Sequence, residues 1–343
     1  MSSGDAGGLA AAQRAVAPYI GQPSPFPATE PLKRRPVGAT LDYVDCGTPT
    51  CALMYSFVQP AAKAIGMKLN RILAGSSASG VQNALNSVVA QKPAAMILPG
   101  LPWQLIKKQL LELKAEGVKI LLSGVTGTGG QIGVVQPSDA FFRQSGKLMA
   151  DYVAAEWGSE SHVAFYAVPE LPFTALIDEG FTSELKAVCA RCTTRTVQFP
   201  IASIGNTAPT QAVSDLQHSP NTTAVIFGTG ELEAGVPAAL RAAGISNVKS
   251  LSFAPGPAAL EDIKNGTSTA ALAYDLVIQE WTQVDQGARE IDGQSLTGPE
   301  AHGLPVVQFL TQHSITFNPA QGWTGYPNFA TRFAKLWGAG GGV

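Results

Sequence analysis

The sequence predicts an α/β protein made of two doubly wound lobes, each built on a parallel sheet. Strand-like apolar runs alternate with segments of helical periodicity over residues 40–135, and the same alternation restarts at 142 and continues to 274. A strand–helix–strand order within one sheet requires parallel strands with helices on both faces. The 343 residues are enough for two such units.

Apolar periodicity and helix-ending glycines define the elements of the first half. Val81, Leu85 and Val88 fall on one face of a helix, and Gly66 and Gly117 end two others. We expect strands over 40–45, 67–73, 94–98, 118–122 and 131–135, and helices over 53–65, 80–91 and 103–116.

The second half repeats this order at a similar spacing, which favours two lobes over one large sheet. We expect strands over 162–167, 194–199, 223–227, 248–253 and 269–274. We expect helices over 142–157, 174–188, 208–217, 232–243 and 257–265.

Both ends of the chain fall outside this alternation. Residues 1–37 are expected to form an N-terminal tether and lead-in, with a short helix over 9–16, because prolines crowd residues 23–36. Residues 315–337 are expected to pack as a C-terminal extension over a lobe or the hinge, rather than to form a functional cluster. The aromatic side chains of that extension are Trp323, Tyr326, Phe329, Phe333 and Trp337.

Composition and charge exclude several classes of protein. Hydrophobic residues make up 45% and charged residues 14% of the chain, which is typical of a globular fold. A formal net charge of −2 provides no basic surface for nucleic acid. No apolar run reaches the ~18 residues that a membrane-spanning helix needs.

The first residues, Met1–Asp5, carry neither a basic segment nor an apolar one. A cytoplasmic protein and an exported protein without its signal both fit this pattern. We favour export, because a Ser/Gly/Asp run commonly follows the lipid-bearing cysteine of a bacterial lipoprotein, which Met1 would replace. The expected location is the periplasm or the cell surface, with the signal absent from this sequence.

Four cysteines form two close pairs, Cys46 with Cys51 and Cys189 with Cys192. A zinc site would need the pairs to converge, although they fall in different predicted lobes. A redox Cys-x-x-Cys usually opens a helix, whereas Cys189 and Cys192 close one. We therefore favour two local disulfides and an oxidising compartment, and expect no metal.

The residues that carry enzyme chemistry do not gather into a motif. Four histidines are scattered, and neither a nucleophile elbow nor a phosphate-binding loop occurs. Gly228-Thr-Gly230 follows a strand as in a dinucleotide site, but Glu233 takes the third-glycine position and would lie against the pyrophosphate. We expect no enzyme activity and no cofactor. Residues 1–36 are also too proline-rich for the DNA-reading helices of a repressor.

Residues 38–312 resemble the periplasmic sugar-binding family of ribose- and galactose-binding type, the type I solute-binding proteins of ABC transporters. The resemblance rests on the order and spacing of five stretches. These are the helix over 53–65 with its Gly66-Met67 step, Val88–Ile97, Leu113–Ile120, Glu179-Gly180-Phe181 and Ala238–Gly244.

The resemblance implies discontinuous lobes joined by a multi-strand hinge, as in a type I periplasmic binding protein. The chain would cross the hinge near 136–137, 274–275 and 304–310. The expected N-terminal lobe is 38–137 plus 276–305. The expected C-terminal lobe is 138–275 plus 306–343, which includes the extension.

The resemblance further implies an extracytoplasmic, monomeric receptor that captures a small sugar or polyol by hinge closure and docks on an ABC permease. The same lobes serve sensors and chemoreceptors, so these roles stay open beside the receptor.

Ligands of open parallel sheets bind at the carboxyl ends of the strands. In the first lobe the expected contacts are Asp45, Cys46, Gly47, Thr48, Ser76, Leu101, Trp103 and Thr126. In the second lobe they are Glu170, Phe173, Thr229, Glu231, Ala254, Tyr274 and Asp275. At some of these positions a structural role is an alternative to ligand contact. Asp45 is suited to bracing its own loop, and Asp275 is suited to capping the helix that follows it.

The chain departs from the family at several expected ligand contacts. Thr229-Gly230 replaces an Asn-Asp pair, Ala254 replaces an aspartate, Tyr274 replaces an amide and an arginine expected near 175 is missing. Buried hydroxyls without partners cost about 1–3 kcal/mol each. These departures favour a small polyol, or a less polar or aromatic ligand stacked on Trp103, Phe173 or Tyr274, over a highly hydroxylated hexose.

Overall fold

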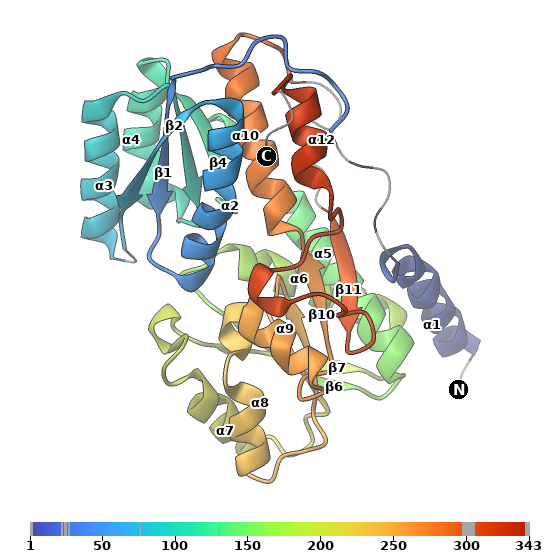
Figure 1. Cartoon of the computed structure of the whole chain (residues 1–343). Coiled ribbons are helices and arrows are strands. Elements are labelled where there is room, and N and C mark those ends of the chain that lie inside the picture. Colours follow the sequence, from blue (N-terminus) through green and yellow to red (C-terminus); the bar gives the residue numbers. More distant parts are fainter. Residues whose placement is uncertain are drawn as a thin grey trace. The chain divides into compact units, whose positions relative to one another are not determined.

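The computed structural model of the chain describes residues 3–21, 23, 26, 28–75, 77–129, 131–296 and 306–339 (Figure 1). Contacts divide the chain into two compact units. Unit 1 comprises Met1–Pro23, Asp139–Tyr274 and Val307–Gly325, and unit 2 comprises Ser24–Ser138, Asp275–Val306 and Tyr326–Val343. Each unit has its own sheet, so the predicted fold class of two parallel-sheet α/β lobes is confirmed.

The sheet of unit 2 is entirely parallel, with the order β2-β1-β3-β4-β5. Its strands lie close to the predicted ranges. They are β1 (Thr40–Asp45), β2 (Lys68–Leu73), β3 (Ala95–Pro99), β4 (Lys119–Ser123) and β5 (Val134–Val135). The central strands β1, β3 and β4 are buried along almost their whole length, as strands covered on both faces must be.

Helices cover both faces of this sheet. α3 (Ala78–Gln91) and α4 (Trp103–Ala115) pack on one face, where Leu85 and Leu110 share one core with Val44 and Leu122. α2 (Pro49–Ile65) and α10 (Leu276–Ile291) contact strands of the sheet and one another. The doubly wound arrangement predicted from the alternation of elements is therefore present.

Local sequence fixes where these helices begin and end. The hydroxyl of Thr48 accepts a hydrogen bond from the Cys51 amide at 3.2 Å and caps α2, and Gly66 ends it with a left-handed φ of 89°. Asp275 caps α10 by accepting from the Ile278 amide at 2.9 Å. Such caps satisfy amides that a helix start otherwise leaves unpaired.

The C-terminal extension is divided between the two units: its residues up to Gly325, including Trp323, belong to unit 1, and its residues from Tyr326 belong to unit 2, whereas the sequence predicted 306–343 together in the C-terminal lobe. α12 (Phe329–Leu336) lies beside α10 (Figure 1), and Trp337 stacks on Trp281 with ring centroids 5.4 Å apart. The indole of Trp337 also donates to the buried Asp285 at 2.7 Å. The packing of these two buried indoles against one another places α12 on α10. The local periodicity of the sequence does not reveal this contact.

Unit 1 has a six-stranded sheet with the order β11-β10-β9-β8-β6-β7. Five strands are parallel and β11 pairs antiparallel with β10 at one edge. The strands are β6 (His162–Ala167), β7 (Thr193–Gln198), β8 (Ala224–Phe227), β9 (Lys249–Phe253), β10 (Ala270–Tyr274) and β11 (Val307–Thr311). The first five were predicted and β11 was not.

The helices of unit 1 include a tightly packed pair, α5 (Asp139–Tyr152) and α6 (Phe173–Val188). A side chain at Gly146 would collide with the carbonyl oxygen of Ile177, and one at Gly180 would collide with that of Arg143. The two glycines therefore permit the close approach of the two backbones. The other α-helices of the unit are α1 (Ser3–Val16), α7 (Ala208–His218), α8 (Val236–Ala242) and α9 (Pro257–Lys264).

Three helical predictions in unit 1 need correction. The tether region contains α1, which is longer than expected and contacts α5 and α6 because Gly8 lets it approach the end of α6. The helix expected over 142–157 changes at Val153–Trp157 into one π-type turn, η2. The helix expected over 232–243 is split into η4 (Gly230–Glu233) and α8, because Gly235 between them has a φ of 79°.

The described helices do not include one with the length and hydropathy needed to cross a membrane.

Candidate functional site

The carboxyl edge of each sheet carries a group of the predicted ligand contacts, and each edge is described within its own unit. In unit 2, Asp45 ends β1 and Cys46, Gly47 and Thr48 form the loop to α2. Leu101 and Trp103 follow β3, and Thr126 follows β4. Ser76 lies outside the described residues.

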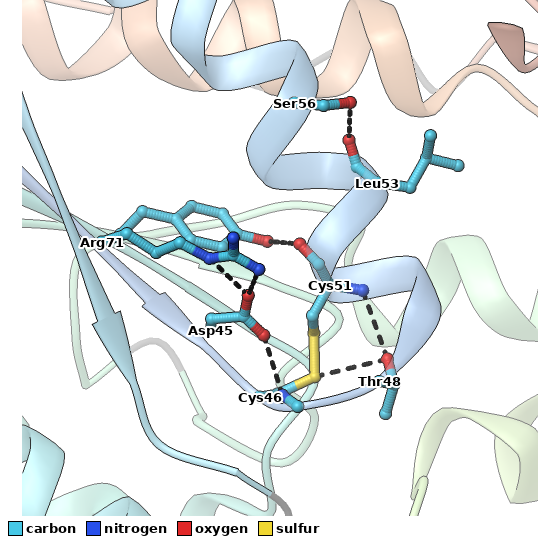
Figure 2. Close-up of polar contacts among 9 residues, drawn as sticks. Asp45, Cys46, Thr48, Cys51, Leu53, Ser56 and Arg71 are labelled. Carbon is cyan, nitrogen blue, oxygen red and sulfur yellow. Dashed lines mark hydrogen bonds and ion pairs between the residues drawn. A yellow bond between two sulfur atoms is a disulfide. The ribbon is translucent and has the colours of Figure 1, made fainter.

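The loop after β1 is held by a disulfide and an ion pair (Figure 2). Cys46 and Cys51 are joined by a disulfide, with Cα atoms 5.8 Å apart, as the sequence predicted. The Asp45 carboxylate is buried, accepts from the Gly47 amide at 2.8 Å and pairs with Arg71, whose Nε lies 2.9 Å away. Asp45 thus has the bracing role foreseen for it.

Arg71 is a functional candidate that the sequence did not single out. Its guanidinium lies 4.6 Å from the ring centroid of Tyr55 while it pairs with Asp45, and its side chain remains 38% exposed. The guanidinium can still donate outward from this fixed position. The sequence feature that could have identified Arg71 is its position on β2, because β2 pairs in parallel with β1, the strand that ends in Asp45.

Trp103 and Leu101 are buried in the core cluster between the sheet and α3 and α4. Trp103 is 5% exposed, and Lys107 places its Nζ 6.0 Å from the ring centroid. Thr126 is half-buried. Ligand contact by these three residues stays a prediction.

Unit 1 presents five aromatic rings at the carboxyl edge of its sheet, here called the aromatic cluster. It consists of Phe141, Phe142, Phe173, Phe253 and Tyr274. Phe253 and Tyr274 end β9 and β10, and the others stand at the starts of α5 and α6. The structure therefore brings together two predicted contacts, Phe173 and Tyr274.

The geometry of the cluster leaves two rings accessible. Phe142 stacks on Phe173 at a centroid distance of 5.1 Å, and Phe141 lies 5.2 Å from Tyr274. Phe142, Phe253 and Tyr274 are buried, whereas Phe141 and Phe173 are half-buried. Ring faces fixed by packing in this way suit the apolar face of a ligand. The sequence missed Phe141, Phe142 and Phe253, because only the packed fold brings them beside Phe173.

The polar residues predicted at this edge have varied surroundings. Thr229 is buried and Glu231 is half-buried at the start of η4. Glu170 is exposed and accepts from the Ile201 amide at 3.1 Å. Asp275 follows β10 and belongs to unit 2, where it is buried and caps α10.

Ala254 holds an unusual backbone conformation directly after β9. Its φ is 50°, a left-handed region that costs an alanine of the order of 1–2 kcal/mol. Its amide donates to the Leu272 carbonyl at 2.9 Å, which ties the loop to β10. A side chain at Gly230 would collide with Pro255, so the two loops after β8 and β9 touch.

Two fully buried glutamates lie close to these edges. Glu233 follows Thr229 and Glu231 in η4, and burial raises its pKa to about 7 although serine hydroxyls, Ser252 foremost, oppose the shift. The side chain of Glu233 is completely buried. Burial likewise raises the pKa of Glu280 to about 8.

Glu280 belongs to a polar group at the end of β4 in unit 2. The amide nitrogen of Gln279 donates to the hydroxyl of Ser123 at 2.8 Å and to Glu280 at 3.0 Å. A pKa of about 8 favours the protonated form of the buried Glu280 carboxyl at neutral pH. Among the described residues, no group of His, Cys, Asp or Glu is arranged to hold a metal ion.

Solved structures with the same fold include solute-binding proteins. One from Agrobacterium vitis, an ABC transporter solute-binding protein bound with α-D-tagatopyranose, has a TM-score of 0.70 and 18% identity, covering 86% of this chain and 98% of that one. A second from Agrobacterium vitis, with bound allitol, has a TM-score of 0.69 and 18% identity, covering 80% and 96%. A glucose-galactose binding protein from Geobacillus stearothermophilus has a TM-score of 0.72 and 14% identity, covering 82% and 99%.

These likenesses establish the fold, and a sequence profile establishes the family. A comparison with curated protein sequences gives no significant match. The profile of the family described as "periplasmic binding protein domain" matches residues 46–295. Because that match covers well over half of the sequence, the chain belongs to the periplasmic binding protein domain family.

Proposed function

We propose that the protein is an exported solute-binding protein of an ABC importer that captures a small sugar or polyol between its two lobes by hinge closure. The family membership supports the receptor role. Three structures of the same fold are described with tagatopyranose, allitol and glucose or galactose as ligands, which supports a carbohydrate or polyol class.

The observation that carries this proposal is the aromatic cluster at the carboxyl edge of unit 1. Sugars and polyols present C–H faces that pack on aromatic rings, while their hydroxyls need hydrogen-bond partners. Phe173 and Phe141 offer half-buried rings at the edge where open parallel sheets bind their ligands.

Partners for the ligand's hydroxyls would come from the loops on both lobes. Thr229 and Glu231 supply a hydroxyl and a carboxylate in unit 1, and Arg71 and Thr126 supply donors in unit 2. The remaining predicted contacts keep their place in the proposal: Asp45, Cys46, Gly47, Thr48, Ser76, Leu101, Trp103, Glu170, Phe173, Ala254, Tyr274 and Asp275.

The mechanism follows from ligand contacts on both lobes. A ligand that touches both lobes binds the closed state more tightly than the open one, so it shifts the population towards closure. The chain passes between unit 1 and unit 2 at residues 23–24, 138–139, 274–275, 306–307 and 325–326, which supplies several chain segments for a hinge. The closed form would then be the one that docks on the permease.

A less polar ligand is the second candidate, and the same cluster favours it. Five rings and Ala254 stand at an edge where the chain lacks the Asn-Asp pair and the arginine of a typical sugar site. Each ligand hydroxyl buried there without a partner would cost about 1–3 kcal/mol. A short or aromatic ligand would avoid that cost.

The test is a calorimetric titration of the protein with allitol, D-tagatose, D-glucose and D-galactose. Phe173→Ala should weaken the best of these ligands at least about tenfold, since a ring contact and its buried area are lost. Phe317→Ala, which removes another half-buried ring of unit 1 away from the cluster, is the matched control and should bind normally. Equal affinity of the two variants would contradict the proposed site.

A further inference from the structure

Unit 1 has a hollow at the opposite edge of its sheet, where the parallel strands begin. A cavity of about 440 Å³ is lined there by residues that include Trp157, Arg191, Ala224 and Lys249. Ala224 starts β8 and Lys249 starts β9, and the parallel register pairs these two residues directly. The volume falls within the range of small-molecule sites, about 300–1,000 Å³.

Trp157 forms an aromatic wall of this cavity. It is the last residue of η2, the π-type turn at the end of α5, and such turns inside helices often mark functional positions. Its ring is half-buried and meets Tyr152 edge-on at 5.9 Å. The Nζ of Lys249 lies 5.7 Å from the centre of the Trp157 ring. The ammonium group of Lys249 thus lies over the face of the Trp157 ring.

Arg191 supplies a second cation in a fixed position. Its guanidinium donates to Glu160 at 2.7 Å and to the buried Ser159 at 2.7 Å. It sits between Cys189 and Cys192, whose disulfide closes the turn that carries it. The second disulfide therefore holds one wall of the cavity.

The charges of the cavity do not cancel. Arg191 and Lys249 are two cations against one carboxylate, Glu160. Throughout the described part of the chain, no carboxylate lies within ion-pair distance of Lys249. One positive charge is thus available beside an aromatic wall, with the hydroxyls of Ser159 and Ser161 lining the same space.

We propose that this cavity is a second ligand site, which binds a small aromatic carboxylate. The ring of the ligand packs against Trp157, and its carboxylate accepts a charge-assisted hydrogen bond from Lys249. The site is separate from the carboxyl edge of the same sheet, because the strands run between them. It does not rest on the proposed sugar site.

The test uses benzoate as the probe and the indole N–H signal of Trp157 in the ¹H–¹⁵N spectrum of the labelled protein as the readout. A ligand of this size is expected to bind with a Kd of about 1 mM. Benzoate should shift the Trp157 signal in a saturable way. Benzamide, which lacks the charge, and acetate, which lacks the ring, should do so at least about tenfold more weakly.

Lys249→Gln should weaken benzoate about tenfold, because it removes the cation and keeps a side chain of similar length. Lys186→Gln, which removes an exposed lysine of α6 outside the cavity, is the matched control and should leave benzoate binding unchanged. A Trp157 signal that does not move at about 20 mM benzoate, well above that Kd, would overturn the proposal. Equal affinities of the two lysine variants would overturn it as well. Sugar titrations of Lys249→Gln, expected to be normal, report on the other site independently.

Discussion

Three buried carboxyl groups have pKa values well above their ordinary range. Burial raises the pKa of Glu280 to about 8 and that of Glu233 to about 7. Burial also raises the pKa of Asp151 to about 7, with Glu184 adding to the shift. In the folded state these groups hold their protons at pH values where the unfolded chain has released them.

The sign of the resulting pH dependence follows from linkage. Between about pH 5 and pH 8 these three carboxyls bind more protons in the folded protein than in the unfolded chain, so their contribution to the free energy of unfolding falls as the pH rises. Below that pH window these carboxyls are protonated in both the folded and the unfolded state, so the loss of stability is absent.

Glu280→Gln should flatten this pH dependence, because glutamine keeps the shape of the protonated acid and cannot ionise. We expect the variant to lose less stability than the parent between pH 5 and pH 8, by an amount on the order of a few kcal/mol. Urea unfolding at several pH values measures it. Glu112→Gln, at an exposed position on α4, is the control and should keep the parent profile. A parental slope in Glu280→Gln would contradict a protonated Glu280.

The helices and strands differ in how readily the sequence reveals them. β1, β3 and β4 lie within a residue or two of their predicted ranges, because buried strands are continuous apolar runs bounded by turn residues. α10 received no predicted bounds, since buried polar side chains such as Glu280, Gln283 and Arg289 erase its apolar stripe. β11 was missed because it is defined by antiparallel pairing with β10, which lies far earlier in the chain, and local sequence patterns do not encode such a pairing.

The packing of α5 on α6 gives a prediction about glycine. Gly146→Ala should destabilise unit 1 by about 1–3 kcal/mol, because the new methyl group collides with the Ile177 carbonyl. Gly7→Ala, at an exposed position of α1 with open space around it, is the matched control and should be neutral or stabilising by up to about 1 kcal/mol. Urea unfolding measures both. Equal effects would show that α5 and α6 do not need the close approach.

The candidate site was only partly visible in the sequence. Phe173 and Tyr274 were identified because the rule that ligands meet the carboxyl ends of parallel strands needs only strand ends. Phe141 and Phe253 join them through packing between elements distant in the chain, and Arg71 acts through its pairing with Asp45. Such roles depend on side-chain contacts between elements, which periodicity does not encode.

At the scale of the whole molecule, the proposed hinge closure makes a prediction about size in solution. The radius of gyration, measured by small-angle X-ray scattering, should decrease when a bound sugar or polyol is saturating, because the closed state is the more compact one. A ligand of the Lys249 cavity alone, such as benzoate, touches only unit 1 and should leave the radius unchanged. An unchanged radius with saturating sugar would contradict closure.

The most direct test of the central claim is a thermal-shift screen of the purified protein against polyols, pentoses, hexoses and small aromatic compounds. A ligand at about 100 times its Kd stabilises the folded state by roughly 2.7 kcal/mol and raises the melting temperature accordingly. We predict that a polyol or sugar raises the melting temperature and that Phe173→Ala reduces the accompanying stabilisation by about half or more, since tenfold weaker binding removes roughly 1.4 kcal/mol of it. A rise with aromatic compounds alone, or with none of the panel, would contradict the proposal that the protein is a sugar or polyol receptor.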